Sequence, residues 1–172
     1  MDAIRAIQTR RSIRSFKPDE IPEETIKEIL ELGNCAPSAG NLQCRDFIVV
    51  RSHEVKHALV EAAMGQTLIE EAPVVIVACA NMKRISPYGG RGRELYCIQD
   101  ADAASYAIIL AAHAKGYGSC WVGAFEPEMV TEALHLPNYA VPTAIIPIGI
   151  PNEKPKEPPK LPVSEITHKE KW

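Results

Sequence analysis

The sequence predicts an α+β fold in which a mixed β-sheet is covered by helices. Helical and strand patterns alternate along the chain, but without the strict strand–helix–strand rhythm of a doubly wound nucleotide-binding fold. Residues 73–80, PVVIVACA, form an apolar run continuous enough to be a strand buried on both faces. Gly116-Tyr117-Gly118 stands between a predicted helix and a predicted strand, which reverses the order of a Rossmann phosphate loop.

Apolar periodicity predicts helices over 2–8, from Pro22 or Glu23 to Gly33, and over 54–63, 100–115 and 126–134. Strands are expected at 47–50, 73–80, 119–122 and 144–150. Residues 82–93 contain Pro87 and three glycines and predict a loop. Whether residues 82–96 act as a lid over a substrate stays open at this point.

The composition is that of one globular domain over residues 1–172, with 46% hydrophobic and 24% charged residues. No apolar run approaches the roughly 20 residues of a membrane helix, and the first residues lack the apolar core of a signal peptide. Five cysteines without a C-x-x-C pair indicate reduced thiols. A cytoplasmic protein without a membrane partner is therefore expected.

Two segments suggest contact with a second subunit. The helix at 100–115 carries seven alanines and is apolar almost all round, which favours burial in its own core and against a partner. From Pro147 onward there are six of the fourteen prolines, which exclude a regular helix. Residues 151–172 are therefore an extended arm or a flexible tail, and an arm that reaches a partner would explain its apolar end at Leu161, Val163, Ile166 and Trp172.

Positive charge is concentrated near the N-terminus. Residues 5–17 hold five basic residues and no acidic one, although the whole chain has a formal charge of -3. Local charge of this kind suits one small anion, whereas nucleic-acid binding would require a basic face. In an extended segment Arg10, Ser12 and Arg14 point the same way and can hold a phosphate. The alternative is a solvated basic stripe at a helix end.

Other chemistry is sparse. The glycines fit neither a Walker loop nor G-x-G-x-x-G, and no G-x-S-x-G is present. His53 and His57 lack a third ligand, so no metal site is predicted. Without an evident acid, base or nucleophile, the chain either only binds a ligand or delegates its chemistry to a cofactor.

An ordered series of motifs resembles the nitroreductase family of FMN-dependent NAD(P)H oxidoreductases, and its compact members in particular. The series is RRSIRSF at 10–16, APSAGNLQ at 36–43, APVVIV at 72–77, GYGSCWVGAF at 116–125, PIG at 147–149 and KLP at 160–162. The resemblance implies a mainly antiparallel central sheet in an obligate homodimer. It also implies FMN at the subunit interface, contacted by both chains.

The resemblance assigns Arg10, Arg11, Ser12 and Arg14 to the FMN phosphate, ribityl chain and pyrimidine edge, and Lys160 to the phosphate. It brings Pro37, Ser38, Asn41 and Gln43 to the flavin, largely from the other subunit, and Trp121, Val122, Gly123 and Ala124 to the ring. The chain departs from the family pattern at two places. The second basic residue usual in the arm is missing, and Lys156 is the substitute. The usual polar residues at the pyrimidine edge are also missing, and Gln66 is the polar replacement.

The implied reaction passes a hydride from NAD(P)H to flavin N5, and then electrons to a nitroaromatic, a quinone or a similar acceptor. No side chain is assigned as catalytic; Arg14 either stabilises the reduced anionic flavin or serves the phosphate, and Tyr88 and Arg91 are candidates for the substrate face. Two alternatives stay open: FMN storage without turnover, and a specialised family reaction such as reductive dehalogenation or flavin fragmentation.

Overall fold

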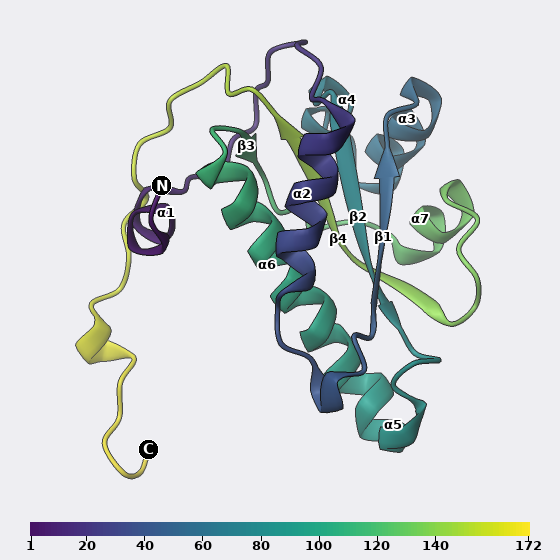
Figure 1. The fold of residues 1–172 in the computed structure, drawn as a ribbon, viewed down its shortest axis with the longest axis vertical. Helices are drawn as coiled ribbons and strands as arrows, with labels where there is room; N and C mark the ends of the chain where they lie inside the picture. The colour runs from purple at the N-terminus through teal and green to yellow at the C-terminus, as the bar shows by residue number, and fades with distance from the viewer.

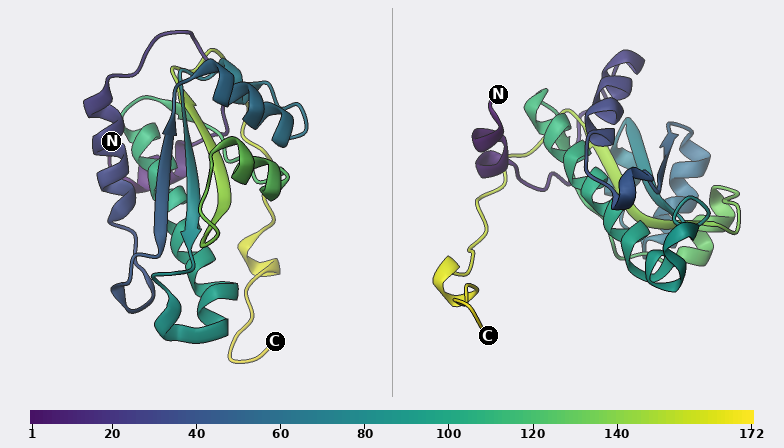
Figure 2. Two further views of the ribbon diagram at one scale, coloured as in Figure 1. Left: turned by 90° about the vertical axis from the view of Figure 1, so that its right-hand side faces the viewer. Right: turned by 60° about the horizontal axis from the view of Figure 1, so that its bottom comes forward.

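A four-stranded antiparallel sheet forms the centre of the molecule. The computed structural model describes all 172 residues. The strands are β1 (Arg45–Val50), β2 (Val74–Asn81), β3 (Gly118–Ser119) and β4 (Ala140–Gly149), in the spatial order β1-β2-β4-β3. Helices α2 (Glu23–Asn34) and α6 (Cys97–Ala114) cover one face (Figures 1 and 2). Helices α3 (His53–Ala62), α4 (Leu68–Glu71) and α7 (Pro127–Ala133) cover the other, which confirms the α+β class.

Strand β2 shows why its sequence is apolar throughout. All eight of its residues are buried, because it pairs with β1 on one side and with β4 on the other. Alternate side chains enter different cores: Ile76 packs in the cluster of α2 and α6, whereas Val75 and Val77 pack with α3 and α7. Each such side chain contributes about 1.5–3 kcal/mol on burial. The prediction of a strand covered on both faces is confirmed.

Helix α6 runs almost the length of the molecule and ends where Gly116, at φ +90°, allows the chain to turn. One face is buried against β2 and β4, with Ala104, Ile108 and Ala112 fully enclosed. Within one chain the opposite face stays uncovered, and Tyr106 is 43% exposed. The burial expected in the chain's own core is therefore present on one face only, and the uncovered face is where the sequence expects a partner.

The loop expected at 82–93 is largely wrong, because the chain turns helical at Ser86. Short helical turns at Ser86–Tyr88, Gly89–Arg91 (α5) and Gly92–Tyr96 lead directly into α6. Pro87 suits the first turn of a helix, where no amide hydrogen is needed. Gly92 serves close packing, since a Cβ there would lie 2.7 Å from Tyr88.

Several boundaries also differ from the expectation. Strand β4 begins four residues earlier, at Ala140, because Pro142 is accommodated where the register with β2 shifts. Strand β3 is only two residues long, and Val122 adds an isolated bridge to Ile145. The named strands pair only antiparallel, and the parallel component of the expected mixed sheet is an isolated bridge between Ser12 and Ser119.

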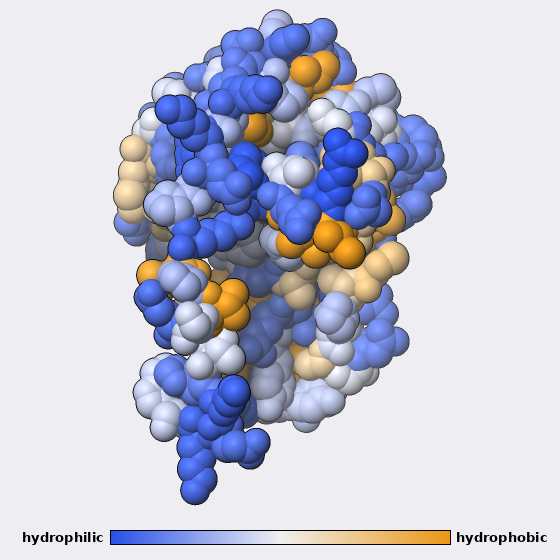
Figure 3. Space-filling view, turned by 90° about the vertical axis from the view of Figure 1, so that its left-hand side faces the viewer, coloured by the Kyte–Doolittle hydropathy of each residue, from blue (hydrophilic) through white to orange (hydrophobic).

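The chain after Ile150 leaves the body and runs beside α1 (Ala3–Thr9), as Figures 1 and 2 show. Apart from one short turn at Val163–Glu165 it is extended and exposed. The large apolar side chains near its end face solvent, as do Ile4 and Ile7 of α1, of which Ile4 is 70% exposed. Figure 3 shows apolar side chains exposed among polar ones on this side of the molecule. No helix of the chain is long and apolar enough to cross a membrane.

Candidate functional site

The segment Arg10–Arg14, here called the arginine segment, is fixed between α1 and β3. Helix α1 is capped by Asp2, whose carboxylate accepts from the Arg5 amide, and ends before Arg10. The Ile13 amide then donates to the Ser119 carbonyl at 3.0 Å. Gly118 permits this approach, because a Cβ there would lie 2.6 Å from Ile13. The backbone of the arginine segment is therefore held by the sheet, with Ile13 packed in the core and the polar side chains of the segment lining the surface beside it.

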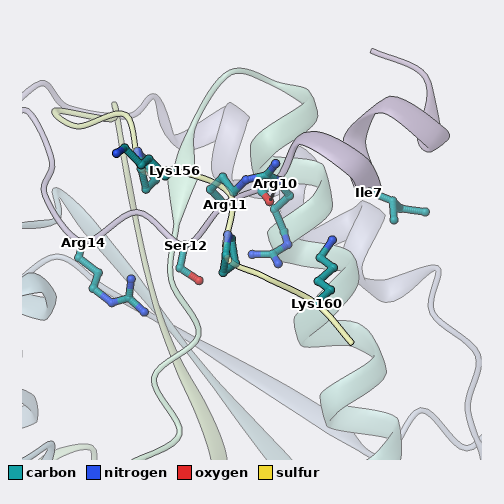
Figure 4. Close-up of a pocket in the computed structure, with 9 residues that line it drawn as sticks. Ile7, Arg10, Arg11, Ser12, Arg14, Lys156 and Lys160 are labelled. Atoms are coloured by element: carbon teal, nitrogen blue, oxygen red, sulfur yellow. Dashed lines mark hydrogen bonds between the residues drawn. The ribbon is translucent and has the colours of Figure 1, made fainter. Parts of the chain in front are cut away.

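A cavity of about 230 Å³ opens beside the arginine segment, and basic side chains of this segment and of the C-terminal arm line it (Figure 4). The first part of the C-terminal arm forms its other wall. The lining residues are Ile7, Arg10, Arg11, Ser12, Arg14, Pro155, Lys156, Pro158 and Lys160. The structure therefore brings the four predicted residues of the segment together with Lys160 and with Lys156, the expected substitute for a second basic residue of the arm.

The polar groups of this cavity are only partly satisfied within the chain. Arg10 Nε is buried and has no hydrogen-bond partner. Arg11 donates to the carbonyls of Gln8 and Arg10 at 2.8 Å each, and it pairs with Glu157 of the arm at 2.8 Å. A buried donor without a partner is costly, and a phosphate oxygen is the kind of acceptor that would satisfy it.

Two titratable groups near the cavity have their pKa values shifted in the direction that favours the neutral form. Burial lowers the pKa of His113, and the charges of Arg10 and Arg11 lower it further. Its Nε2 is hydrogen-bonded to the Thr9 hydroxyl at 2.8 Å, which ties α6 to α1. Burial raises the pKa of the Cys120 thiol, and Arg14 and Ser12 oppose that shift. Neither group supplies a counter-charge to the arginines.

The loop of residues 36–44 has an unusual backbone. Gly40, Asn41 and Gln43 have φ of +56°, +55° and +51°, and the last two lack the freedom of glycine. The Ser38 hydroxyl accepts from the Gln43 amide at 3.0 Å, which closes the turn. Strain in non-glycine residues costs about 1–3 kcal/mol each and concentrates at functional sites. Pro37, Ser38, Asn41 and Gln43 are thus held together in one shaped loop.

The residues predicted to lie against the flavin ring form a third group, which adjoins the arginine segment. Gln66, which precedes α4, donates to the Ala124 carbonyl at 3.0 Å and so joins this part of the chain to the stretch that contains Val122 and Gly123. The Trp121 side chain is 36% exposed and lies against Gly123. Because Ser12 bridges Ser119 just ahead of this stretch, Gln66, Trp121 and Ala124 belong to the same end of the molecule as Arg10.

Tyr88 and Arg91, the candidates for the substrate face, lie beside the 36–44 loop. A Cβ at Gly40 would meet the Tyr88 hydroxyl at 2.6 Å, so the ring rests on the loop. Tyr88 packs edge-on against Tyr96 at 5.6 Å between ring centroids, and Arg91 donates to the Tyr96 hydroxyl at 2.9 Å. An aromatic wall therefore continues from the loop into the helical turns before α6.

Helix α6 separates these groups. Near its start, Asp100 accepts from the amide of Ala39 at 2.9 Å; near its end, His113 contacts Thr9, next to the arginine segment. The two residues are thirteen positions apart along the helix, or about 20 Å. A single chain thus brings the arginine segment, the arm lysines and the 121–124 stretch together, but it places the 36–44 loop at the other end of α6 (Figure 1).

Sequence reasoning missed two acidic residues of the arm and one of α6. Glu153 accepts from the amides of Arg14 and Ser15, the latter at 3.2 Å, and Glu157 pairs with Arg11. Their alternation with the arm lysines was the available signal. Asp100 resembles any acidic residue near a helix start, and nothing in the sequence connects it with the 36–44 loop.

His53 and His57 both contact Glu70, at 2.8 and 3.5 Å, on the surface of α3.

Comparison with known proteins places the chain in a family. The sequence model of the Nitroreductase family matches residues 7–71 and 57–150. A Thermus thermophilus protein named NADH dehydrogenase is 36% identical over 194 residues, covering 96% of this chain and 95% of the relative. A Bacillus subtilis protein named FMN reductase [NAD(P)H] is 30% identical over 185 residues, covering 99% and 74%.

Solved structures agree with the sequence comparison. NfrA2 from B. megaterium superposes with a TM-score of 0.93 at 30% identity, covering all of this chain and 76% of that one. The predicted fold and the predicted relationship are both confirmed by these matches. The chain belongs to the nitroreductase family.

Proposed function

We propose that this chain is an FMN-dependent oxidoreductase that takes a hydride from NAD(P)H and reduces a small acceptor such as a nitroaromatic or a quinone. Its family and the FMN reductase among its relatives support this class, as predicted. FMN supplies the reversible acceptance of a hydride, which side chains do not provide. The five thiols are all unpaired, as suits the reducing cytoplasm.

The buried, unpartnered Nε of Arg10 is the observation that carries the assignment of the phosphate site. Arg10, Arg14 and the Ser12 hydroxyl line one cavity with Lys156 and Lys160, so that a doubly charged phosphate would meet several donors at once. Arg11 forms an ion pair with Glu157 and would hold the arm at the edge of the cavity. A ligand without an acceptor oxygen here would leave the Arg10 donor unsatisfied, and the surrounding cations favour an anionic one.

The ring would lie along Trp121, Val122, Gly123 and Ala124, with the Gln66 amide held near its polar edge. Fixed backbone amide donors of this stretch, beside a ring that gains negative charge on reduction, would stabilise the reduced form without any proton transfer. Arg14 remains a candidate for the same role, since its side chain lines the cavity and its charge acts on Cys120, the residue before Trp121.

Two copies of the chain would complete the site. The 36–44 loop lies about 20 Å along α6 from the arginine segment of its own chain. Exposed apolar side chains of α1, α6 and the arm, including Ile4, Tyr106 and Leu161, offer a surface for a partner. In such a homodimer, each single-domain subunit would present Asn41 and Gln43 to the flavin of the other, and residues 151–172 would reach across.

Absorption spectroscopy of the purified protein tests this function. The protein should carry FMN, and anaerobic mixing with NADH or NADPH should bleach the flavin band, after which a quinone or nitroaromatic should restore it. If FMN binds but neither nucleotide bleaches it, the chain stores flavin and is not an oxidoreductase. If FMN does not bind at all, the proposal fails at its first step.

A further inference from the structure

We infer that Asp100 and Arg45 are positioning residues for the flavin, because together they hold the 36–44 loop in the shape that presents Asn41 and Gln43. The inference rests on the proposed function, since it concerns how that function's ring-binding loop is built. Neither side chain is free to touch the ligand itself. Both act through the backbone of the loop.

Asp100 grips the loop by its amides. Its carboxylate accepts from the Ala39 amide at 2.9 Å with one oxygen and from the Cys44 amide at 3.4 Å with the other. These two amides flank the strained residues Asn41 and Gln43 on either side. Asp100 is only 5% exposed, and its place on the long, packed helix α6 gives the loop a rigid support.

Arg45 grips the preceding residues by their carbonyls. Its guanidinium donates to the carbonyls of Asn34, Ala36 and Pro37 at 2.7, 2.9 and 3.2 Å. Its Nε donates to the Asn34 side chain at 3.3 Å. The residue is 4% exposed, and its planar fork suits several fixed acceptors better than a lysine would. The end of α2 and the start of the loop are thereby fixed to β1.

A loop that only connected α2 to β1 would not require this arrangement. Burying two charged groups is unfavourable unless each is fully hydrogen-bonded, and positive φ at two non-glycine residues adds strain. Both unfavourable terms are tolerated because the hydrogen bonds from Asp100 and Arg45 fix the conformation of the loop. The benefit is a pair of amide side chains whose backbone is fixed before the ligand arrives, so that less ordering is required on binding.

The test compares Asp100→Asn with Asp102→Asn, which changes the next acidic residue of the same helix and has no contact with the loop. Asparagine can accept from only one of the two loop amides, so Asp100→Asn leaves the other unpaired. We expect the Kd for FMN to rise about tenfold, the effect of one lost charge-assisted hydrogen bond, with a changed flavin circular dichroism signal and midpoint potential. Asp102→Asn should behave as wild type in all three.

Arg45→Lys is the second variant, because lysine keeps the charge but cannot donate to three carbonyls in a plane. It should show the same three changes. If both variants melt at lower temperature but bind FMN with wild-type Kd, dichroism and potential, the two residues serve stability alone and the inference is wrong.

Hydrogen exchange of the wild type provides a test without substitutions. The Ala39 and Cys44 amides should be protected before FMN is added. If they exchange freely in the FMN-free protein and become protected only on binding, the loop is not preformed and the inference is wrong. Failure of wild type to bind FMN would instead contradict the proposed function, so the two failures are distinguishable.

Discussion

The arginines near the two ends of α6 differ in how far their hydrogen-bond donors are satisfied within the chain. At the start of the helix, all three guanidinium nitrogens of Arg45 have acceptors within the chain. At the far end, Arg10 Nε has none, and Arg11 takes its partner, Glu157, from the exposed arm. All the guanidinium nitrogens of Arg45 are thus satisfied within the chain, whereas the Arg10 Nε is not. This difference supports the proposals that Arg45 positions a loop and that the arginine segment binds an anion.

Removal of the incomplete group should have the largest effect. Arg10→Ala with Arg14→Ala deletes two charged donors of the cavity, and charged hydrogen bonds contribute about 1.5–3 kcal/mol each. The Kd for FMN should therefore rise at least about 100-fold, measured by quenching of flavin fluorescence. Lys27→Ala, a change on the surface of α2, serves as the control. A double variant that purifies with full FMN occupancy would remove the distinction between the two ends.

Gly118→Ala tests whether the sheet holds the arginine segment in place. The added Cβ would lie 2.6 Å from Ile13, and overpacking of this kind costs about 1–3 kcal/mol. The melting temperature should fall and FMN binding should weaken. Gly90→Ala is the matched control, because the nearest atom is a flexible Glu94 oxygen at 4.0 Å. Equal melting temperatures for the two variants would contradict the packing described.

Glu157→Gln should strengthen FMN binding. The Glu157 carboxylate pairs with Arg11 and with Lys160, so it competes with the phosphate for the same cations. Exposed ion pairs contribute up to about 1 kcal/mol, which limits the gain to about fivefold in Kd. Glu165→Gln, farther along the arm, controls for a general change in charge. Weaker binding after Glu157→Gln would show that this carboxylate orients the cations instead of competing.

His113 should report the arrival of an anion. Burial and the charges of Arg10 and Arg11 hold its pKa below the usual value, so the fold favours the neutral ring. This contribution to stability is present above the unfolded pKa of about 6.5 and is lost as the pH falls below it, through the lower pKa of the folded state. FMN at the arginines should raise the pKa, which a titration followed by NMR would detect. An unchanged pKa at saturating FMN would place the phosphate elsewhere.

The sequence predicted those parts of the fold that depend on local pattern. PVVIVACA is a strand buried on both faces because apolar side chains are needed on each side of a central strand. The turns at 86–96 were missed because Gly92 indicates flexibility in a sequence but serves close packing against Tyr88 in the structure. A glycine's neighbours in space are not visible in the sequence.

The candidate site was predictable to a similar degree. The arginine segment could be found because its charge contrasts with that of the whole chain. Asp100 could not be found, since its contacts with the loop join residues 56 and 61 positions apart. Arg45 could not be found either, since its acceptors are backbone carbonyls, which any residue supplies. The roles of the individual flavin-binding residues stay predictions.

The central claim is that the arginine segment holds the phosphate of FMN. Riboflavin has the same ring and ribityl chain without the phosphate, so a titration of the wild-type protein with both ligands isolates that interaction. FMN should bind at least about 100-fold more tightly than riboflavin, as expected for two or more charge-assisted hydrogen bonds. Equal affinity for the two ligands would contradict the account.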